Sequence, residues 1–131
     1  MRNFEPISSE IEELATKILD CAFKVHRTLG PGLMESVYEI CLGHELKQLG
    51  IKFQSQVSLP VKYQGIEMEG GMSLDMLVED KIILELKAAE KMIPLYDAQL
   101  MTYLKLTNLR MGLLINFNVP LLKDGIKRIV L

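Results

Sequence analysis

Two acidic residues and one lysine in the middle of the chain have the types and spacing that phosphodiester chemistry needs. Residues 72–79 and 82–87 are predicted strands joined by a three-residue connection, so they can pair as a hairpin. This pairing places Asp75 directly opposite Glu85, with Cβ atoms about 5 Å apart. Lys87 follows Glu85 by two residues and therefore points to the same face of the hairpin.

Two carboxylates at that distance repel, which pushes one of them toward protonation unless a cation offsets the charge. Oxygen ligands favour hard divalent cations such as Mg²⁺ or Mn²⁺ over zinc. Such an ion makes hydroxide available near neutral pH, and the Lys87 ammonium can hold the water or stabilise charge on a phosphate oxygen. The pattern therefore predicts a metal site for hydrolysis.

The same residues also have an ordinary interpretation, because Asp, Glu and Lys on a solvated sheet face often form weak salt bridges. The flanking sequence favours the functional interpretation. The segments Met76-Leu77-Val78 and Ile82-Ile83-Leu84 are typical of a sheet interior, where unpaired carboxylates are costly and tend to mark function. The register also predicts one wholly apolar face, formed by the pairs Leu74/Leu86, Met76/Leu84 and Val78/Ile82.

Apolar periodicity places these residues within a mixed arrangement of helices and strands. A capping box at Ser8 opens a predicted helix over residues 11–29, Gly30-Pro31-Gly32 ends it, and a second helix covers 33–49. Residues 51–63 alternate as strands up to a turn at Gln64-Gly65, and Gly70-Gly71 marks a second break. The remaining predicted elements are strands over 72–79 and 82–87, a helix over 95–106, and strands over 111–117 and 126–130. The order is α-α-β-β-β-β-α-β-β, an α/β (α+β) fold with a mixed central sheet flanked by helices.

Composition limits the class of protein. The chain has 131 residues, 49% of them apolar and 24% charged, which predicts a single domain over residues 1–131. No apolar run approaches the about 18 residues of a membrane span. The segment Met1–Glu13 is acidic and lacks the basic region followed by an apolar region that a signal peptide has, so we expect a cytoplasmic protein. The net charge of −2 divides evenly between the two halves, so affinity for nucleic acid must come from a local groove or a bound cation.

Three further residues are candidates, although each has a common structural explanation. Glu35 lies near the start of the second predicted helix, where the helix dipole alone favours an acidic residue. Gln99 and Tyr103 are four residues apart and share one helix face, yet such a tyrosine is usually part of the core. His26 is expected to be a packing or capping residue, and Tyr38 either lines the pocket or packs under its helix.

The stretch from His26 to Glu39, HRTLGPGLMESVYE, resembles the signature of the GxxExxY proteins, a group placed in the PD-(D/E)XK nuclease superfamily. The similarity continues through Asp75, the Glu85-Leu86-Lys87 segment, residues 99–103 and residues 113–117, and so covers nearly the whole chain. The resemblance implies a restriction-endonuclease-like core.

The resemblance also implies roles for individual residues. Asp75, Glu85 and Lys87 match the D…ExK core of the superfamily. Glu35 matches the helix-borne acidic residue that completes the metal site, so the implied metal ligands are Glu35, Asp75 and Glu85. Gln99 and Tyr103 match the Q-x-x-x-Y helix motif of RecB-like members. One position departs from the pattern: Ser73 stands where the family commonly has a basic residue.

These observations lead to two hypotheses. The first is a Mg²⁺- or Mn²⁺-dependent nuclease that acts on nucleic acid, with DNA as the substrate that the resemblance favours. The alternative is a non-catalytic nucleic-acid-binding or protein-assembly module that keeps the nuclease fold, consistent with the neutral charge balance and with Ser73. The shortness of the chain adds the hypothesis of a homodimer, because one copy offers little surface to hold a duplex.

Overall fold

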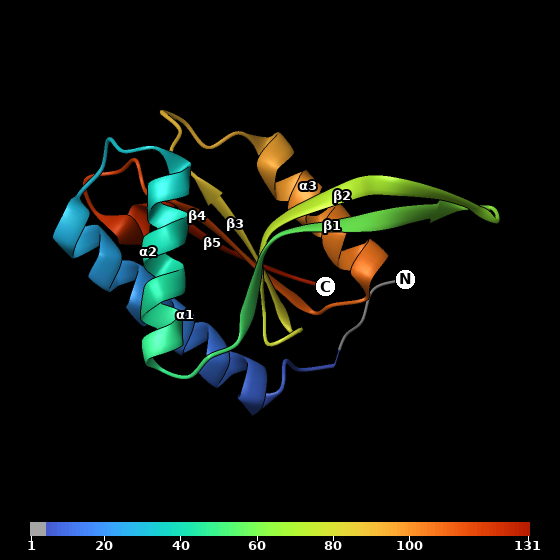
Figure 1. The fold of residues 1–131 in the computed structure, drawn as a ribbon, viewed down its shortest axis with the longest axis horizontal. Helices are drawn as coiled ribbons and strands as arrows, with labels where there is room; N and C mark the ends of the chain where they lie inside the picture. Colours follow the sequence, from blue (N-terminus) through green and yellow to red (C-terminus); the bar gives the residue numbers. More distant parts are fainter. Residues whose placement is uncertain (1–4) are drawn as a thin grey trace.

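The computed structural model describes residues 5–131 and contains a five-stranded sheet with helices against both faces (Figure 1). Residues 1–4, the start of the segment that we compared with a signal peptide, lie outside the described residues. Among the described residues, no helix is both long and apolar enough to cross a membrane. The elements are α1 (Ser9–Leu29), α2 (Glu35–Gln48), β1 (Phe53–Tyr63), β2 (Ile66–Val78), β3 (Ile82–Lys87), α3 (Pro94–Thr107), β4 (Met111–Asn116), η1 (Leu122–Gly125) and β5 (Ile126–Val130).

The helices begin where the local sequence provides a start signal. The hydroxyl of Ser8 accepts a hydrogen bond from the Ile11 N–H at 3.2 Å, which confirms the predicted cap of α1. Helix α3 begins with Pro94, whose fixed φ suits the first helical turn. Helix α2 begins at Glu35, two residues later than predicted, because Met34 still has an extended backbone.

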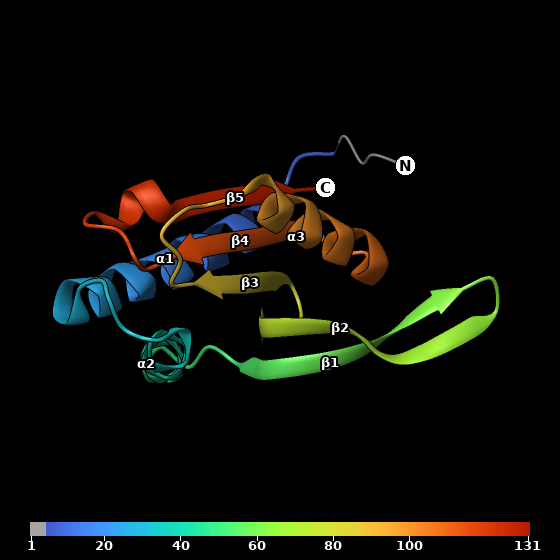
Figure 2. The same cartoon turned by 90° about the horizontal axis from the view of Figure 1, so that it is seen from above.

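The helices form two apolar layers on opposite faces of the sheet (Figure 2). Helices α1 and α2 cover one face, and α3 covers the other. The first layer is built around Ile18, Ala22, Tyr38, Leu42, Leu84, Leu113 and Phe117, and the second around Leu74, Ile83, Leu100, Leu104 and Leu114. Burial of these side chains supplies the main driving force for folding.

The strands lie in the order β1-β2-β3-β4-β5, so neighbours in the sequence are neighbours in the sheet. All adjacent strands are antiparallel except β3 and β4, which are parallel and are connected through α3. The predicted fold class, a mixed sheet flanked by helices, is therefore confirmed. Strand β3 lies at the centre of the sheet.

The predicted break at Gly70-Gly71 is wrong. Strand β2 runs without interruption from Ile66 to Val78, so three strands, not four, precede α3. The register with β1 shifts between Leu59 and Val61, which places the two glycines in a β-bulge. Gly70 has a φ of 68°, a conformation that glycine adopts without strain. The glycines therefore bend the β1–β2 hairpin, which projects beyond the rest of the sheet (Figure 1).

The predicted register of the second hairpin is confirmed for Met76/Leu84 and Val78/Ile82, but it does not extend to Asp75. The β2–β3 ladder ends at Met76. On β1, Gln56 lies between the residues that pair with Met76 and Leu74, and it has a φ of 52°. The wholly apolar face is also wrong at one position. Leu74 packs in the α3 layer, whereas Met76 packs in the α1–α2 layer, so these two side chains do not share one face of the sheet.

Replacement of Gly112 by alanine should destabilise the protein, because a Cβ atom at this position would lie 2.7–2.9 Å from three side-chain atoms of the buried Leu100. We expect Gly112→Ala to lower the free energy of unfolding by about 1–3 kcal/mol, measured by urea denaturation. In a Leu100→Ala background the same change should cost much less, since the space is then open. An equal loss in both backgrounds would contradict this packing argument.

Candidate active site

Asp75 is held beside the central strand by its own side chain. Its Oδ2 atom accepts a hydrogen bond from the Leu86 N–H at 2.8 Å, where an antiparallel ladder would have a backbone carbonyl. The carboxylate therefore replaces a strand–strand hydrogen bond and stays close to Glu85, the residue before Leu86. The structure thus brings together the first two predicted site residues, although not by direct strand pairing.

Glu85 is buried in the centre of the sheet, with 4% of its surface exposed. Among the described residues its Oε1 atom has no hydrogen-bond partner. The pKa of Glu85 is raised from 4.5 to about 8, chiefly by burial; the negative charge of Asp75 and a hydrogen bond with that residue also raise it, and the attraction of Lys87 opposes them. A buried carboxyl group with a pKa raised to near neutral pH is typical of a functional site.

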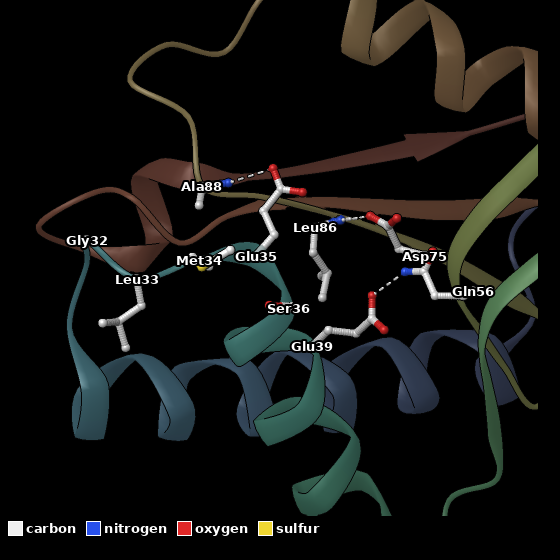
Figure 3. Close-up of a pocket in the computed structure, with 10 residues that line it drawn as sticks. All are labelled: Gly32, Leu33, Met34, Glu35, Ser36, Glu39, Gln56, Asp75, Leu86 and Ala88. Carbon is white, nitrogen blue, oxygen red and sulfur yellow. Dashed lines mark hydrogen bonds between the residues drawn. The ribbon is translucent and has the colours of Figure 1, made fainter.

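A cleft of about 770 Å³ opens between Asp75 and the start of α2 (Figure 3). Glu35 lies in the first turn of α2 and is exposed to the cleft. Its Oε1 atom lies 3.4 Å from the backbone nitrogen of Ala88, directly after β3. The residues that line the cleft are Gly32, Leu33, Met34, Glu35, Ser36, Glu39, Gln56, Asp75, Leu86 and Ala88.

Glu39 is a second acidic residue of α2 in this cleft, and our sequence analysis did not single it out. Its Oε1 atom accepts a hydrogen bond from the Gln56 side chain at 2.7 Å (Figure 3). Burial raises the pKa of Glu39, and the charges of Asp75 and Glu35 raise it further, while the bond from Gln56 lowers it. The signal was present in the sequence, because Glu39 follows Glu35 by four residues and so shares its helix face.

The loop before α2 is fixed by Tyr38, which is fully buried. Its hydroxyl donates a hydrogen bond to the Gly30 carbonyl at 2.7 Å and accepts one from the Leu33 N–H at 3.1 Å. Its ring stacks on Phe117, with a distance of 4.4 Å between ring centroids. Of the two predicted alternatives for Tyr38, the structure shows the one in which it packs under the helix. The tyrosine holds the loop that leads into Glu35.

His26 is likewise structural, as we expected. Its Nε2 atom lies 2.8 Å from the Val119 carbonyl oxygen, and the residue is buried. Asn116 has a comparable role at the end of β4. Its side chain accepts a hydrogen bond from the Ala89 N–H at 3.0 Å and donates one to the Ala89 carbonyl at 2.9 Å. These contacts fix the chain where it leaves β3.

Lys87 is half-buried at the end of β3, and its Nζ atom lies 4.5 Å from the centre of the Tyr96 ring. Tyr103, on the same helix as Tyr96, is partly buried. Burial raises the pKa of Tyr103, and the charges of Glu85 and Asp75 raise it further, whereas a hydrogen bond with the Ser73 backbone lowers it. Gln99 is exposed on α3, one turn before Tyr103. Two helices therefore supply side chains around the end of β3.

The donor atoms suit a hard divalent cation, although they do not form a complete cage. Within residues 5–131, no three side chains of the types His, Cys, Asp and Glu are arranged to hold a metal ion. The structure therefore brings Asp75 and Glu85 together but does not place Glu35 with them as a third ligand. Mg²⁺ is commonly bound by one or two carboxylates, with water and substrate phosphate completing its coordination. The Oε1 atom of Glu85, which has no partner within residues 5–131, fits such an ion, because a cation would compensate a buried acceptor.

Comparison with known proteins gives one family match for the chain. Residues 12–129 match the sequence model of a family described as the PD-(D/E)XK nuclease superfamily. No curated protein matches the chain. Among solved structures, the crystal structure of SSO0001 has 21% sequence identity and a TM-score of 0.46. That match covers 92% of this chain and 57% of the other, so this chain spans less than two thirds of the length of SSO0001.

The buried Glu85 should make the metal-free protein less stable as the pH rises. Its pKa is about 8 in the folded chain against an ordinary 4.5, so between these values the folded chain binds a proton that the unfolded chain releases. The resulting stabilisation is complete below pH 4.5 and is lost by about pH 8, at up to about 1.4 kcal/mol per pH unit. Urea denaturation in EDTA from pH 5 to 9 measures this slope.

In Glu85→Gln the slope should become shallower, because the titrating group is gone. Glu67→Gln, a change on the exposed end of β2, provides the matched control and should keep the wild-type slope. A stability that rises between pH 5 and 8, or an unchanged slope in Glu85→Gln, would show that Glu85 does not titrate in this way.

Proposed function

Since the chain belongs to the PD-(D/E)XK nuclease superfamily, we propose that it is a divalent-metal-dependent nuclease that hydrolyses phosphodiester bonds, with DNA as its substrate. The observation that carries this proposal is the buried Glu85 carboxyl beside Asp75, one oxygen of which has no hydrogen-bond partner in the part of the chain that the structure describes. Membership of the narrower GxxExxY group, a single domain over residues 1–131, a cytoplasmic location and a homodimer stay predictions.

Asp75 and Glu85 would hold Mg²⁺ or Mn²⁺, and Glu35 faces the same cleft as Asp75 as the proposed third acidic ligand. A bound divalent cation supplies a hydroxide nucleophile near neutral pH and offsets the charge of the phosphate. The cation would also offset the negative charge of the cleft, because the carboxylates of Glu35, Glu39 and Asp75 would otherwise repel a nucleic acid.

The other proposed site residues act on the water and the phosphate. The Lys87 ammonium lies on the same face as Glu85, where it orients the attacking water and stabilises negative charge that develops on the phosphate. The hydroxyl of Tyr103, whose pKa burial raises above its ordinary value, can donate a hydrogen bond to a phosphate oxygen. Gln99 is exposed one turn earlier on α3, where its amide can position the same phosphate.

Purified protein incubated with single-stranded, duplex and branched DNA, and with RNA, in Mg²⁺ or Mn²⁺ should cut at least one of these substrates. Asp75→Asn and Lys87→Ala should each lower the rate by about 100-fold or more, as the loss of a group that stabilises a transition state does. Lys62→Ala, on the exposed part of β1, should retain the wild-type rate and serves as the control. No cutting by a folded, metal-loaded sample would favour the non-catalytic binding or assembly module.

Metal binding should also be visible without a substrate. We expect saturating Mn²⁺ to raise the melting temperature, by about 10 °C at a concentration 100 times the dissociation constant, and EDTA to reverse the shift. Asp75→Asn and Glu85→Gln should reduce this shift strongly, whereas Glu69→Gln on the exposed part of β2 should not. Differential scanning calorimetry measures it. Equal shifts in all variants would contradict a metal site at Asp75 and Glu85.

A further inference from the structure

We propose that Tyr96 is a positioning residue for Lys87, an inference that rests on the proposed nuclease function. The Nζ atom of Lys87 lies over the Tyr96 ring, 4.5 Å from its centre. An ammonium at this distance is attracted to the electron-rich face of the ring. The contact joins the end of β3, which carries Glu85 and Lys87, to the first turn of α3.

Lys87 needs such a partner because its side chain is long and flexible. A lysine ammonium sits on a four-carbon stem and loses rotational freedom when it is fixed in one place. Lys87 takes part in none of the salt bridges within residues 5–131. The aromatic ring is therefore the contact that restricts the ammonium before substrate binds.

Tyr96 is itself fixed in place by contacts of its backbone and its side chain. Its N–H donates a hydrogen bond to the Ile93 carbonyl at 3.0 Å, and its side chain packs against the α3 layer of the core. The next residue, Asp97, forms an ion pair with Lys127 of β5 at 2.7 Å. The start of α3 is thus tied to the sheet, and the ring keeps a fixed place relative to β3.

The spacing along α3 connects Tyr96 with the other proposed site residues. Tyr96 precedes Gln99 by three residues and Tyr103 by seven, so the three side chains follow one stripe of the helix. The Tyr96 ring therefore keeps the Lys87 ammonium near the face of α3 that carries Gln99 and Tyr103, the two proposed phosphate contacts. The sequence signal was this spacing, which we had read only from Gln99 onward.

The decisive comparison is between Tyr96→Leu and Tyr96→Phe. Phenylalanine keeps the ring face and removes the hydroxyl, whereas leucine removes the ring. We expect Tyr96→Leu to lower kcat by about 2- to 30-fold, the range that a cation–π contact of 0.5–2 kcal/mol corresponds to, while Tyr96→Phe stays near wild type. Binding of a DNA oligonucleotide in Ca²⁺ should change little in either variant. Leu95→Ala, the neighbouring exposed residue, is the control for disturbance of the helix start.

A spectroscopic measurement tests the contact without any turnover. In protein labelled with ¹³C-lysine, the ε-CH₂ protons of Lys87, assigned by loss of the signal in Lys87→Arg, should be shifted upfield by the ring. The shift should persist in Tyr96→Phe and disappear in Tyr96→Leu. A structural role of Tyr96 alone would lower stability without moving this resonance.

The possible failures can be told apart. A wild-type protein that cuts no substrate overturns the nuclease function and this inference with it. A wild-type protein that cuts DNA, with kcat unchanged or increased in Tyr96→Leu, overturns only the positioning role. An unshifted Lys87 resonance in the wild type overturns it as well.

Discussion

The burial of one carboxyl group in the centre of the sheet is the constraint on which the rest of the site depends. Glu85 lies in a strand whose other residues from Ile82 to Leu86 are apolar and buried. A charged group in such surroundings is unfavourable, and the nearby Asp75 increases the difficulty. Folding alone gains nothing from this arrangement. A bound cation would offset the charges of the two carboxylates. The arrangement is therefore better explained by a role in function than by a role in stability.

Asp75 explains how a cleft forms beside a continuous sheet. By accepting the Leu86 N–H, its side chain ends the ladder between β2 and β3 and separates the two strands beyond Met76. The start of α2 borders the resulting space on one side (Figure 3). Asp75 is therefore both a proposed metal ligand and the residue that opens the cleft through which a metal ion would reach it.

Much of the fold followed from local patterns, whereas the site depended on contacts that no local pattern contains. Periodicity and caps predicted the helices, and the two short runs at residues 72–79 and 82–87 predicted a pair of strands. The bulge at Gly70-Gly71 was misjudged, because two adjacent glycines can either end a strand or bend it. The Asp75 side chain replaces a backbone acceptor for the Leu86 N–H. This contact depends on the tertiary structure, so the strand pairing predicted from the sequence was wrong at this position. Glu39 and Tyr96 were missed although their helical spacing was visible in the sequence.

The central place of β3 has a consequence for motion. This strand pairs with β4 along its whole length and with β2 from Ile82 to Leu84, whereas the β1–β2 hairpin extends past the sheet with only its own two strands (Figure 2). Local opening should therefore start in the hairpin, and amide hydrogens of β3 should exchange only on global unfolding. Fluctuations of the periphery can then adapt to a ligand while the acidic centre stays rigid.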